Sequence, residues 1–286
     1  MTTTLRFAVV LFALTFLART SEAQLTKIFV ASYGNDANDG SRGAPKRNFQ
    51  PAHNAVAAGG QIVVLDTAGY GALTINKSLA VTVPPGVNGF VTVSGSSNGI
   101  LISASSSDIV VLRGLIVEGG GPAANGTGIV AVSVGRLTVD DCVVRNFTVG
   151  TYLLNAPGSH LLVRGGSVRN TQFGIEVHAA SSGVILDGLV TNCAVDNASQ
   201  AALFVRNEAV SSVAATLTAV GCTLTNSGNG LVANGSTSVL YADNCVVSGN
   251  TTDVATVNGA NTFSRGNNVC TNNAGTGSFT GALSGK

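Results

Sequence analysis

One segment of this chain occurs twice, and the repeat constrains the fold more than any other feature. LTVDDCVVRNFTVG (Leu137–Gly150) returns as LLVRGGSVRNTQFG (Leu161–Gly174), and in both copies Val-Arg-Asn is separated from a Gly by the same short spacer. The register continues through Asn146, Asn170, Asn192, Asn226 and Asn250, at similar intervals except for a longer one before Asn226. Short alternating apolar runs at such intervals are typical of a solenoid. We therefore predict an all-β fold, a single-stranded parallel β-helix over residues 61–286.

The repeated Asn residues have a structural explanation in such a coil. Where the chain turns sharply, backbone carbonyl and N–H groups lose their strand partners. A side-chain amide at each turn can bond these groups and the amides of the coils above and below. The spacing therefore predicts a ladder of five stacked, inward-facing Asn side chains.

The N-terminus resembles a secretory signal peptide over residues 1–23. Arg6 precedes an apolar run of twelve residues, Phe7–Ala18, and Ser21-Glu22-Ala23 places small residues where a signal peptidase cleaves. The alternative is a membrane anchor, but the run makes roughly 18 Å of helix, too short for a ~30 Å hydrocarbon core. We predict a secreted or periplasmic protein with no membrane span.

Residues 24–60 differ from the repeats and are predicted to form an N-terminal cap. Phe49–Ala58 is the one segment with helical apolar spacing, and Gly59-Gly60 ends it. A solenoid has to cover the open ends of its core, which a short amphipathic helix can do.

The composition narrows the partners. The net charge is +1 and there is no basic stripe, so nucleic acid is not expected. Charged residues make up 10% against a typical ~25%, and Gly numbers 36, as suits stacked strands and tight turns. A polysaccharide is the partner we consider, although the lack of Trp weakens any argument from sugar stacking. The oligomeric state cannot be predicted.

Five cysteines follow the signal peptide, at Cys142, Cys193, Cys222, Cys245 and Cys270. The nearly equal spacing of the last three, close to that of the Asn repeat, predicts a column of stacked, buried free thiols. A Cys222–Cys245 disulfide is the alternative. Asp36, Asn38 and Asp39 resemble half a calcium loop, but no bidentate Glu follows at the required spacing. We predict no cofactor and no metal, with Ca²⁺ at this loop as the alternative.

The run VASYGNDANDGSRGAPKRNFQPAHNAVAAGGQIVVLDTAGYGALTINKSLAVTV (Val30–Val83) and the later NGILISASSSDIVVLRGLIVEG resemble right-handed parallel β-helix proteins of the pectin lyase-like superfamily. The chain is most similar to small exported bacterial members without an assigned activity. The resemblance implies a right-handed coil, but the superfamily includes lyases, hydrolases, esterases and epimerases as well as passive rods. Its catalytic motifs are missing here: Gln172 follows Asn170-Thr171, Asp140-Asp141 stands alone, and no His precedes Gly.

The most reactive local chemistry lies on the predicted strand Gly174–His178. If Ile175 and Val177 face the core, Glu176 and His178 project from the outer face two residues apart. Aligning the Gly and Ala residues that open neighbouring strands places Tyr152 beside Glu176, one coil earlier.

One coil later, the same alignment places Phe204 beside Glu176 and Arg206 beside His178, with Glu208 further along. Arg or His could abstract the proton alpha to a uronate carboxylate, a neighbouring cation could stabilise the enolate, and Tyr could protonate the leaving oxygen. The candidate catalytic set is Tyr152, Glu176, His178 and Arg206. The alternative is a solvated sheet face with a His–Glu pair.

Two further register predictions are structural. Arg164 should lie over Asp140 as a cross-strand ion pair. Arg145 should stack under Arg169, which is unfavourable unless an anion such as an acidic glycan lies between them.

Two functions remain open: a non-catalytic surface or extracellular rod that binds glycans, or a lyase or epimerase acting on acidic polysaccharide.

Overall fold

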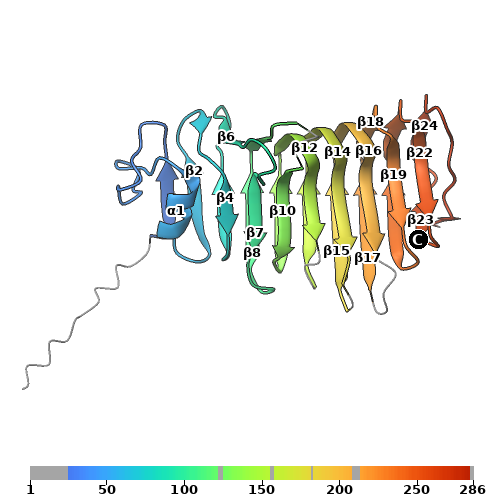
Figure 1. Cartoon of the computed structure of the whole chain (residues 1–286), viewed down its shortest axis with the longest axis horizontal. Helices are drawn as coiled ribbons and strands as arrows, with labels where there is room; N and C mark the ends of the chain where they lie inside the picture. Colours follow the sequence, from blue (N-terminus) through green and yellow to red (C-terminus); the bar gives the residue numbers. More distant parts are fainter. Residues whose placement is uncertain (1–24, 122–124, 155–157, 182, 208–212, 284–286) are drawn as a thin grey trace, which may run out of the picture.

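The computed structural model describes residues 25–121, 125–154, 158–181, 183–207 and 213–283. The predicted signal peptide and Glu208 lie outside these ranges. The described chain winds into a rod of stacked parallel strands, with its N-terminal coils at one end and its C-terminal coils at the other (Figure 1). In these ranges the structure has no helix of the length and apolar character needed to span a membrane. The predicted parallel β-helix is confirmed.

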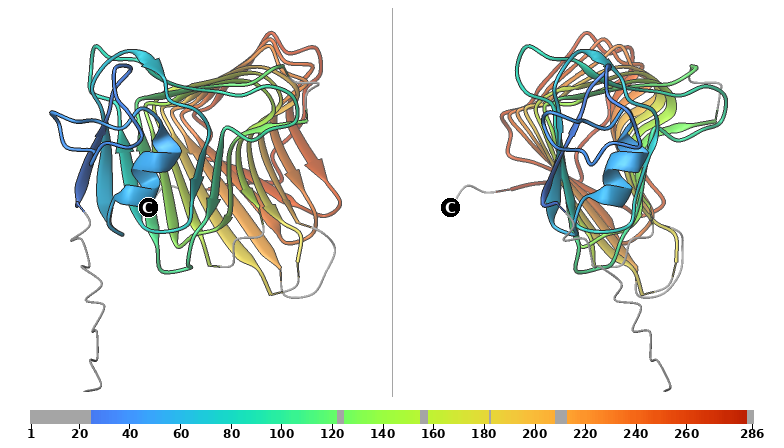
Figure 2. Two further views of the ribbon diagram at one scale, coloured as in Figure 1. Left: turned by 60° about the vertical axis from the view of Figure 1, so that its left-hand side comes forward. Right: turned by 90° about the vertical axis from the view of Figure 1, so that its left-hand side faces the viewer.

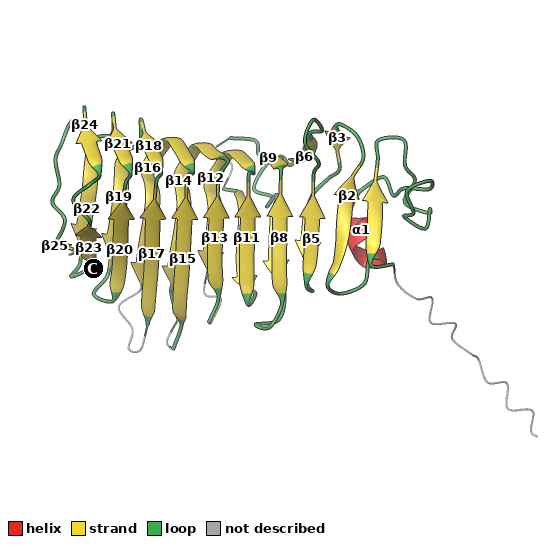
Figure 3. Ribbon diagram, turned by 180° about the vertical axis from the view of Figure 1, so that it is seen from behind, coloured by secondary structure: helices red, strands yellow, loops and turns green. Residues whose placement is uncertain are grey.

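One sheet, called sheet A here, has 11 strands that run side by side along the rod (Figure 3). Ten steps of ~4.8 Å make this sheet roughly 48 Å long. Its strands, in spatial order, are β1 (Lys27–Val30), β2 (Gly60–Val64), β5 (Leu79–Thr82), β8 (Ile109–Arg113), β11 (Arg136–Asp140), β13 (His160–Arg164), β15 (Ile185–Thr191), β17 (Ala214–Val220), β20 (Ser238–Asp243), β23 (Asn261–Ser264) and β25 (Gly281–Ala282).

The remaining 14 strands form sheet B, which bends around the rest of each coil (Figure 2). The longest strands, of 12 to 14 residues, continue through this bend. In chain order the strands are β3 (Ala68–Gly69), β4 (Leu73–Ile75), β6 (Gly89–Thr92), β7 (Ile100–Ser103), β9 (Leu115–Glu118), β10 (Thr127–Ser133), β12 (Val143–Leu154), β14 (Ser167–Ala179), β16 (Ala194–Asn207), β18 (Thr223–Thr225), β19 (Asn229–Asn234), β21 (Val246–Ser248), β22 (Thr252–Val257) and β24 (Val269–Thr271).

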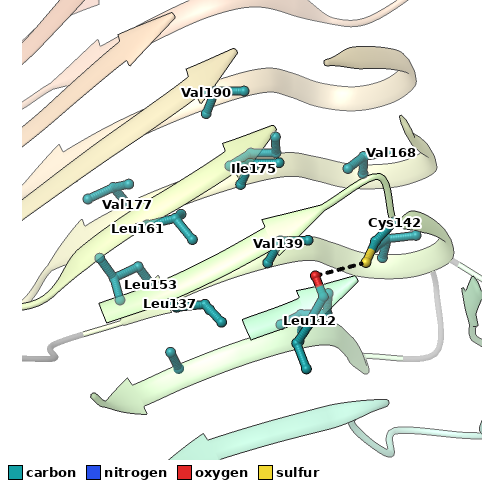
Figure 4. Packing of buried hydrophobic residues seen from close by; sticks show 14 of the residues in the cluster. Leu112, Leu137, Val139, Cys142, Leu153, Leu161, Val168, Ile175, Val177 and Val190 are labelled. Atoms are coloured by element: carbon teal, nitrogen blue, oxygen red, sulfur yellow. Dashed lines mark hydrogen bonds between the residues drawn. The ribbon is translucent and has the colours of Figure 1, made fainter. Parts of the chain in front are cut away.

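The core lies between the sheets and consists of aliphatic columns. Alternate residues of each strand point inward, and register pairs such as Leu137↔Leu161 and Val139↔Val163 stack like on like. Figure 4 shows these side chains converging from both sheets. Such stacking explains why the repeat needs a similar residue at each position but tolerates changes in the surface loops.

The Asn ladder exists, but two of its five predicted members are wrong. The column consists of Asn146, Asn170, Asn197 and Asn226. Two side-chain hydrogen bonds run along it: Asn170 Nδ2 donates to Asn146 Oδ1 at 3.2 Å, and Asn197 Nδ2 donates to Asn170 Oδ1 at 2.9 Å. All four have positive φ, between 53° and 65°, a region that Asn tolerates better than most residues. From Asn170 on, the last three are exposed, so the ladder is a surface column rather than the predicted inward-facing one.

Asn192 and Asn250 occupy other positions. Asn192 lies at the preceding corner, where sheet A ends, and also has positive φ, 51°. Asn250 is buried, accepts a bond from the Ser227 N–H at 2.9 Å and donates to the Leu224 carbonyl at 3.1 Å. Asn197 lies near the middle of the interval from Asn170 to Asn226, so two coils share the extra length. An assumption of one long insertion therefore selected the wrong Asn.

The thiol column also exists with a different membership. Four cysteines lie at the same position of successive coils, each one residue before a strand of sheet B begins: Cys142, Cys193, Cys222 and Cys245. The strands that follow are paired in register, beginning with Val143↔Ser167, Ser167↔Ala194, Ala194↔Thr223 and Thr223↔Val246. Gly166 takes the place between the first two. All four thiols are free and buried, and Cys142 Sγ lies 3.6 Å from the Leu112 carbonyl oxygen (Figure 4). The prediction for Cys270 is wrong: it pairs with Val247, two positions further along, and is exposed.

The predicted helix is present and shorter, as α1 (Phe49–Ala55). Phe49 and Ala52 are buried and the helix packs on β1, β2 and β4 at the N-terminal end of the rod (Figure 1). The helix ends at Ala55, because the next residue, Val56, leaves helical geometry with ψ 144°. The parallel sheet itself starts at β1, upstream of this helix.

Candidate functional site

Three adjacent strands of sheet B bring the four candidate residues together. Tyr152 on β12 pairs with Glu176 on β14, which pairs with Phe204 on β16, and His178 pairs with Arg206. This register is the one predicted from the sequence. Ile175 and Val177 are fully buried in the core, so Glu176 and His178 point from the opposite face of the sheet.

This outer face is not the solvated sheet face that was the alternative to a catalytic set. Only 1% of Glu176 and 6% of His178 is exposed. A second apolar cluster lies on the same face, separate from the core. It consists of Ala201, Phe204 and Val232, with Phe173 and Ala255 packed against it. Phe173 was missed, although it belongs to the repeat and precedes the Gly that opens the strand.

The polar side chains bond to one another. Arg206 Nε lies 2.6 Å from Glu176 Oε1, and the Tyr152 hydroxyl lies 2.7 Å from His178 Nδ1. His178 Nδ1 is 3.9 Å from Glu176 Oε1. These contacts join all four predicted residues into one network, here called the Arg206 cluster.

Aromatic rings support the exposed part of the Arg206 cluster. The guanidinium carbon of Arg206 lies 5.4 Å from the centre of the Phe204 ring, within the range of a cation–π contact. The Phe204 ring stacks on Phe173 at 5.4 Å. One third of the Arg206 side chain remains exposed, against 1% for Glu176, so Arg206 is the more accessible member of this ion pair.

The electrostatics follow from burial. Loss of water raises the pKa of the Glu176 carboxyl, and the charge and hydrogen bond of Arg206 offset only part of this effect. Burial lowers the pKa of Arg206, but Glu176 and Tyr152 outweigh burial and leave that pKa raised. Arg206 therefore stays charged, and it favours the ionised form of Glu176 against the effect of burial.

The predicted ion pair between Asp140 and Arg164 is present, and Asp140 has a second arginine partner as well. Asp140 accepts bonds from Arg164 on one side, at 2.9 Å, and from Arg113 on the other, at 2.8 Å. These arginines hold the pKa of Asp140 below its usual range, with Arg164 contributing most. Asp141 instead takes the corner, with φ 51°. The two adjacent carboxylates are thus separated, one within an ion-pair ladder and one in a turn.

Arg145 and Arg169 are stacked in register, as predicted. Arg145 Nη2 lies 3.0 Å from Glu118 Oε2 in the preceding coil. A carboxylate therefore accompanies the column, and Arg169 donates to Ser167 Oγ at 3.2 Å.

The predicted half calcium loop, Asp36, Asn38 and Asp39, bonds the backbone around it, including the residues just before α1. Asp36 Oδ1 accepts the N–H groups of Arg47 and Asn48, both at 2.9 Å. Asp39 accepts the Ser41 N–H, and the Asn38 amide donates to the Pro45 carbonyl. Each side chain thus has its own local partner. In the described part of the chain, no group of three or more His, Cys, Asp or Glu side chains is placed to hold a metal ion.

Comparison with known proteins agrees with this architecture. The family described as "Right handed beta helix region" matches residues 90–251, more than half of the chain. The chain belongs to the right-handed β-helix family. No curated protein and no solved structure matches it. This right-handed β-helix has the fold that the resemblance implied, and its chemistry has to be argued from its own residues.

Proposed function

We propose that this right-handed β-helix is an exported, non-catalytic rod that binds an acidic polysaccharide at the Arg206 cluster. The observation that carries the proposal is the 2.6 Å pair between Arg206 and a Glu176 that is almost completely buried. The carboxylate lies beneath the arginine and fixes it, while the exposed third of Arg206 faces outward.

Acidic sugars supply the complementary groups. A guanidinium has a planar fork of donors that suits the carboxylate of a uronate or the sulfate of a sulfated sugar. The partly exposed Phe173 ring stacks on Phe204, the ring under Arg206, and offers an apolar surface for a sugar ring. The weak net charge of the chain, +1, means that attraction of an anionic polymer has to come from a local site of this kind.

The same contacts argue against proton transfer. A general base has to come within hydrogen-bond reach of the proton that it removes. Glu176 and His178 are buried, and each already bonds another member of the cluster. The network therefore supports Arg206 and leaves neither group open to a substrate.

The second candidate is a lyase or epimerase acting on acidic polysaccharide, and one observation favours it. The 2.7 Å bond between the Tyr152 hydroxyl and His178 Nδ1 is the arrangement that a tyrosine acid and its proton partner would need. In that case Arg206 would stabilise an enolate.

Calorimetric titration with oligogalacturonate and a sulfated glycan tests the binding proposal. Arg206→Met combined with Glu176→Leu removes the guanidinium without leaving a buried charge, and should abolish a salt-sensitive affinity. The matched control is Arg265→Met. Arg265 also pairs with an acid, Asp243 at 3.3 Å, but it lies directly after strand β23 of sheet A. Equal affinity of the double variant and the control would refute the proposal.

A further inference from the structure

A hollow of about 350 Å³ lies at the N-terminal end of the outer face of sheet B, the face that carries the Arg206 cluster. It is lined by Gln50 of α1, by Ala72, Leu73 and Thr74 at β4, by Ser97 and Asn98 of the turn before β7, and by Leu101 of β7. None of these seven residues is charged. The volume is in the lower range of small-ligand sites, which suits a single ring.

The walls of this hollow are held in place by its neighbours. The Gln50 side-chain oxygen accepts the Thr74 N–H at 2.8 Å, and the Asn98 side-chain oxygen accepts the Thr127 N–H at 3.1 Å. A side chain at Gly126 would lie 2.5 Å from the Ser97 carbonyl, so the turn packs closely on the next coil. Preformed walls reduce the entropy cost of binding.

The Asn98 amide and two hydroxyl groups provide hydrogen-bond donors at the hollow. Because Asn98 uses its side-chain oxygen, its Nδ2 group is left as the donor. Among the described residues the Thr74 and Ser97 hydroxyls bond no side chain or backbone group, and both residues are exposed. Leu101, which pairs with Thr74 on the outer face, adds an apolar surface. Hydroxyl and amide donors around an apolar patch, without charge, match an uncharged sugar ring.

The hollow is in register with the Arg206 cluster. Thr74, Leu101, Val130, Tyr152, Glu176 and Phe204 form one outward column across six strands. Four strand steps separate Leu101 from Phe204, which corresponds to roughly 19 Å. A chain of several sugar rings has this length.

We propose that the hollow is a second subsite, for an uncharged sugar ring, and that the ligand is a glycan with both uncharged and acidic residues. The site for the uncharged ring stands on the hollow alone, whereas the acidic part rests on the proposed function of Arg206. Two variants address the hollow: Thr74→Val with Ser97→Ala removes both hydroxyls, and Leu101→Trp fills the space. Thr138→Val is the control, because Thr138 lies on sheet A, away from the hollow.

Saturation-transfer NMR with methyl glycosides of neutral hexoses is the direct test. We expect a signal from the native chain, from Thr138→Val and from the Arg206→Met/Glu176→Leu variant, and none from Leu101→Trp. With a mixed neutral and acidic glycan, the Thr74/Ser97 variant should bind about tenfold more weakly, as the loss of two hydrogen bonds predicts.

The two proposals fail in different ways. If no neutral hexoside binds, or if Leu101→Trp binds as well as the native chain, the hollow is not a subsite, whatever happens at Arg206. If hexosides bind the hollow while the affinity for acidic glycans is unchanged by the loss of Arg206, the subsite for the uncharged ring stands and the acidic site is refuted.

Discussion

Removal of Arg206 tests whether the Arg206 cluster is a structural support for one exposed cation. In Arg206→Met, the Glu176 carboxylate would stay buried without its 2.6 Å partner. Breaking a buried pair from one side costs about 3–5 kcal/mol. Because one third of Arg206 is exposed, water weakens the pair and we expect the lower end, about 3 kcal/mol. For a chain of this size that lowers Tm by roughly 6 °C.

The pH dependence has a definite sign. The pKa of Glu176 is raised in the folded state by burial, so its contribution to stability is greatest below the unfolded pKa and is lost as pH rises through the folded pKa. Without Arg206 this pKa rises further. The variant should therefore be close to the native chain at low pH, where Glu176 is protonated, and much less stable at neutral pH.

Thermal unfolding followed by circular dichroism at both pH values measures this effect. Adding Glu176→Leu to Arg206→Met should restore most of the loss, because no buried charge remains. Arg113→Met is the matched control: Asp140 keeps Arg164, so the cost should stay below about 1 kcal/mol. An equal loss at both pH values, or no rescue by Glu176→Leu, would refute the reasoning.

Three further outcomes follow from the coil geometry. An aromatic disulfide reagent should titrate only Cys270 in the folded protein and all five thiols after denaturation, and a second fast-reacting thiol would contradict the buried column. Gly166→Ala should cost more than about 2 kcal/mol in denaturant unfolding, since its Cβ would lie 2.1 Å from the Cys142 carbonyl, whereas Gly183→Ala, with a similar φ and open space, should cost about 1 kcal/mol. Asn197→Gly should be nearly neutral and Asn197→Val should cost about 1–2 kcal/mol; equal melting temperatures would show that φ at this corner is not limiting.

The repeat made most of the fold predictable because stacking forces equivalent residues into one column. The Tyr152–Glu176 and His178–Arg206 alignments were correct for this reason. The Asn192 assignment failed because residue spacing cannot show how an insertion is divided between coils. Asn250 failed for another reason: the coil there is one residue shorter than the spacing assumed, so Gly249 lies level with Asn226. Cys270 was misplaced because its coil is also shorter than the cysteine spacing, so it lies two positions beyond the column.

Burial on the outer face was the main feature that the sequence did not reveal. Strand alternation shows that Glu176 points away from the core, but it does not show what covers it. The cover depends on residues of the next coil: the Phe204 ring, which stacks on Phe173, and Arg206, which folds back over the carboxylate. The hollow beside α1 was equally hidden, because it joins a helix, a strand and a turn that are distant in sequence.

The measurement that tests the central claim most directly combines binding and turnover in one sample. The native chain and His178→Ala are incubated with acidic polysaccharides, with and without calcium, while ultraviolet absorbance of unsaturated uronates, reducing ends and bound glycan are followed together. A non-catalytic rod predicts binding without any product, and binding that survives His178→Ala. Product that forms with the native chain and disappears in His178→Ala would contradict the account and make the Arg206 cluster an active site.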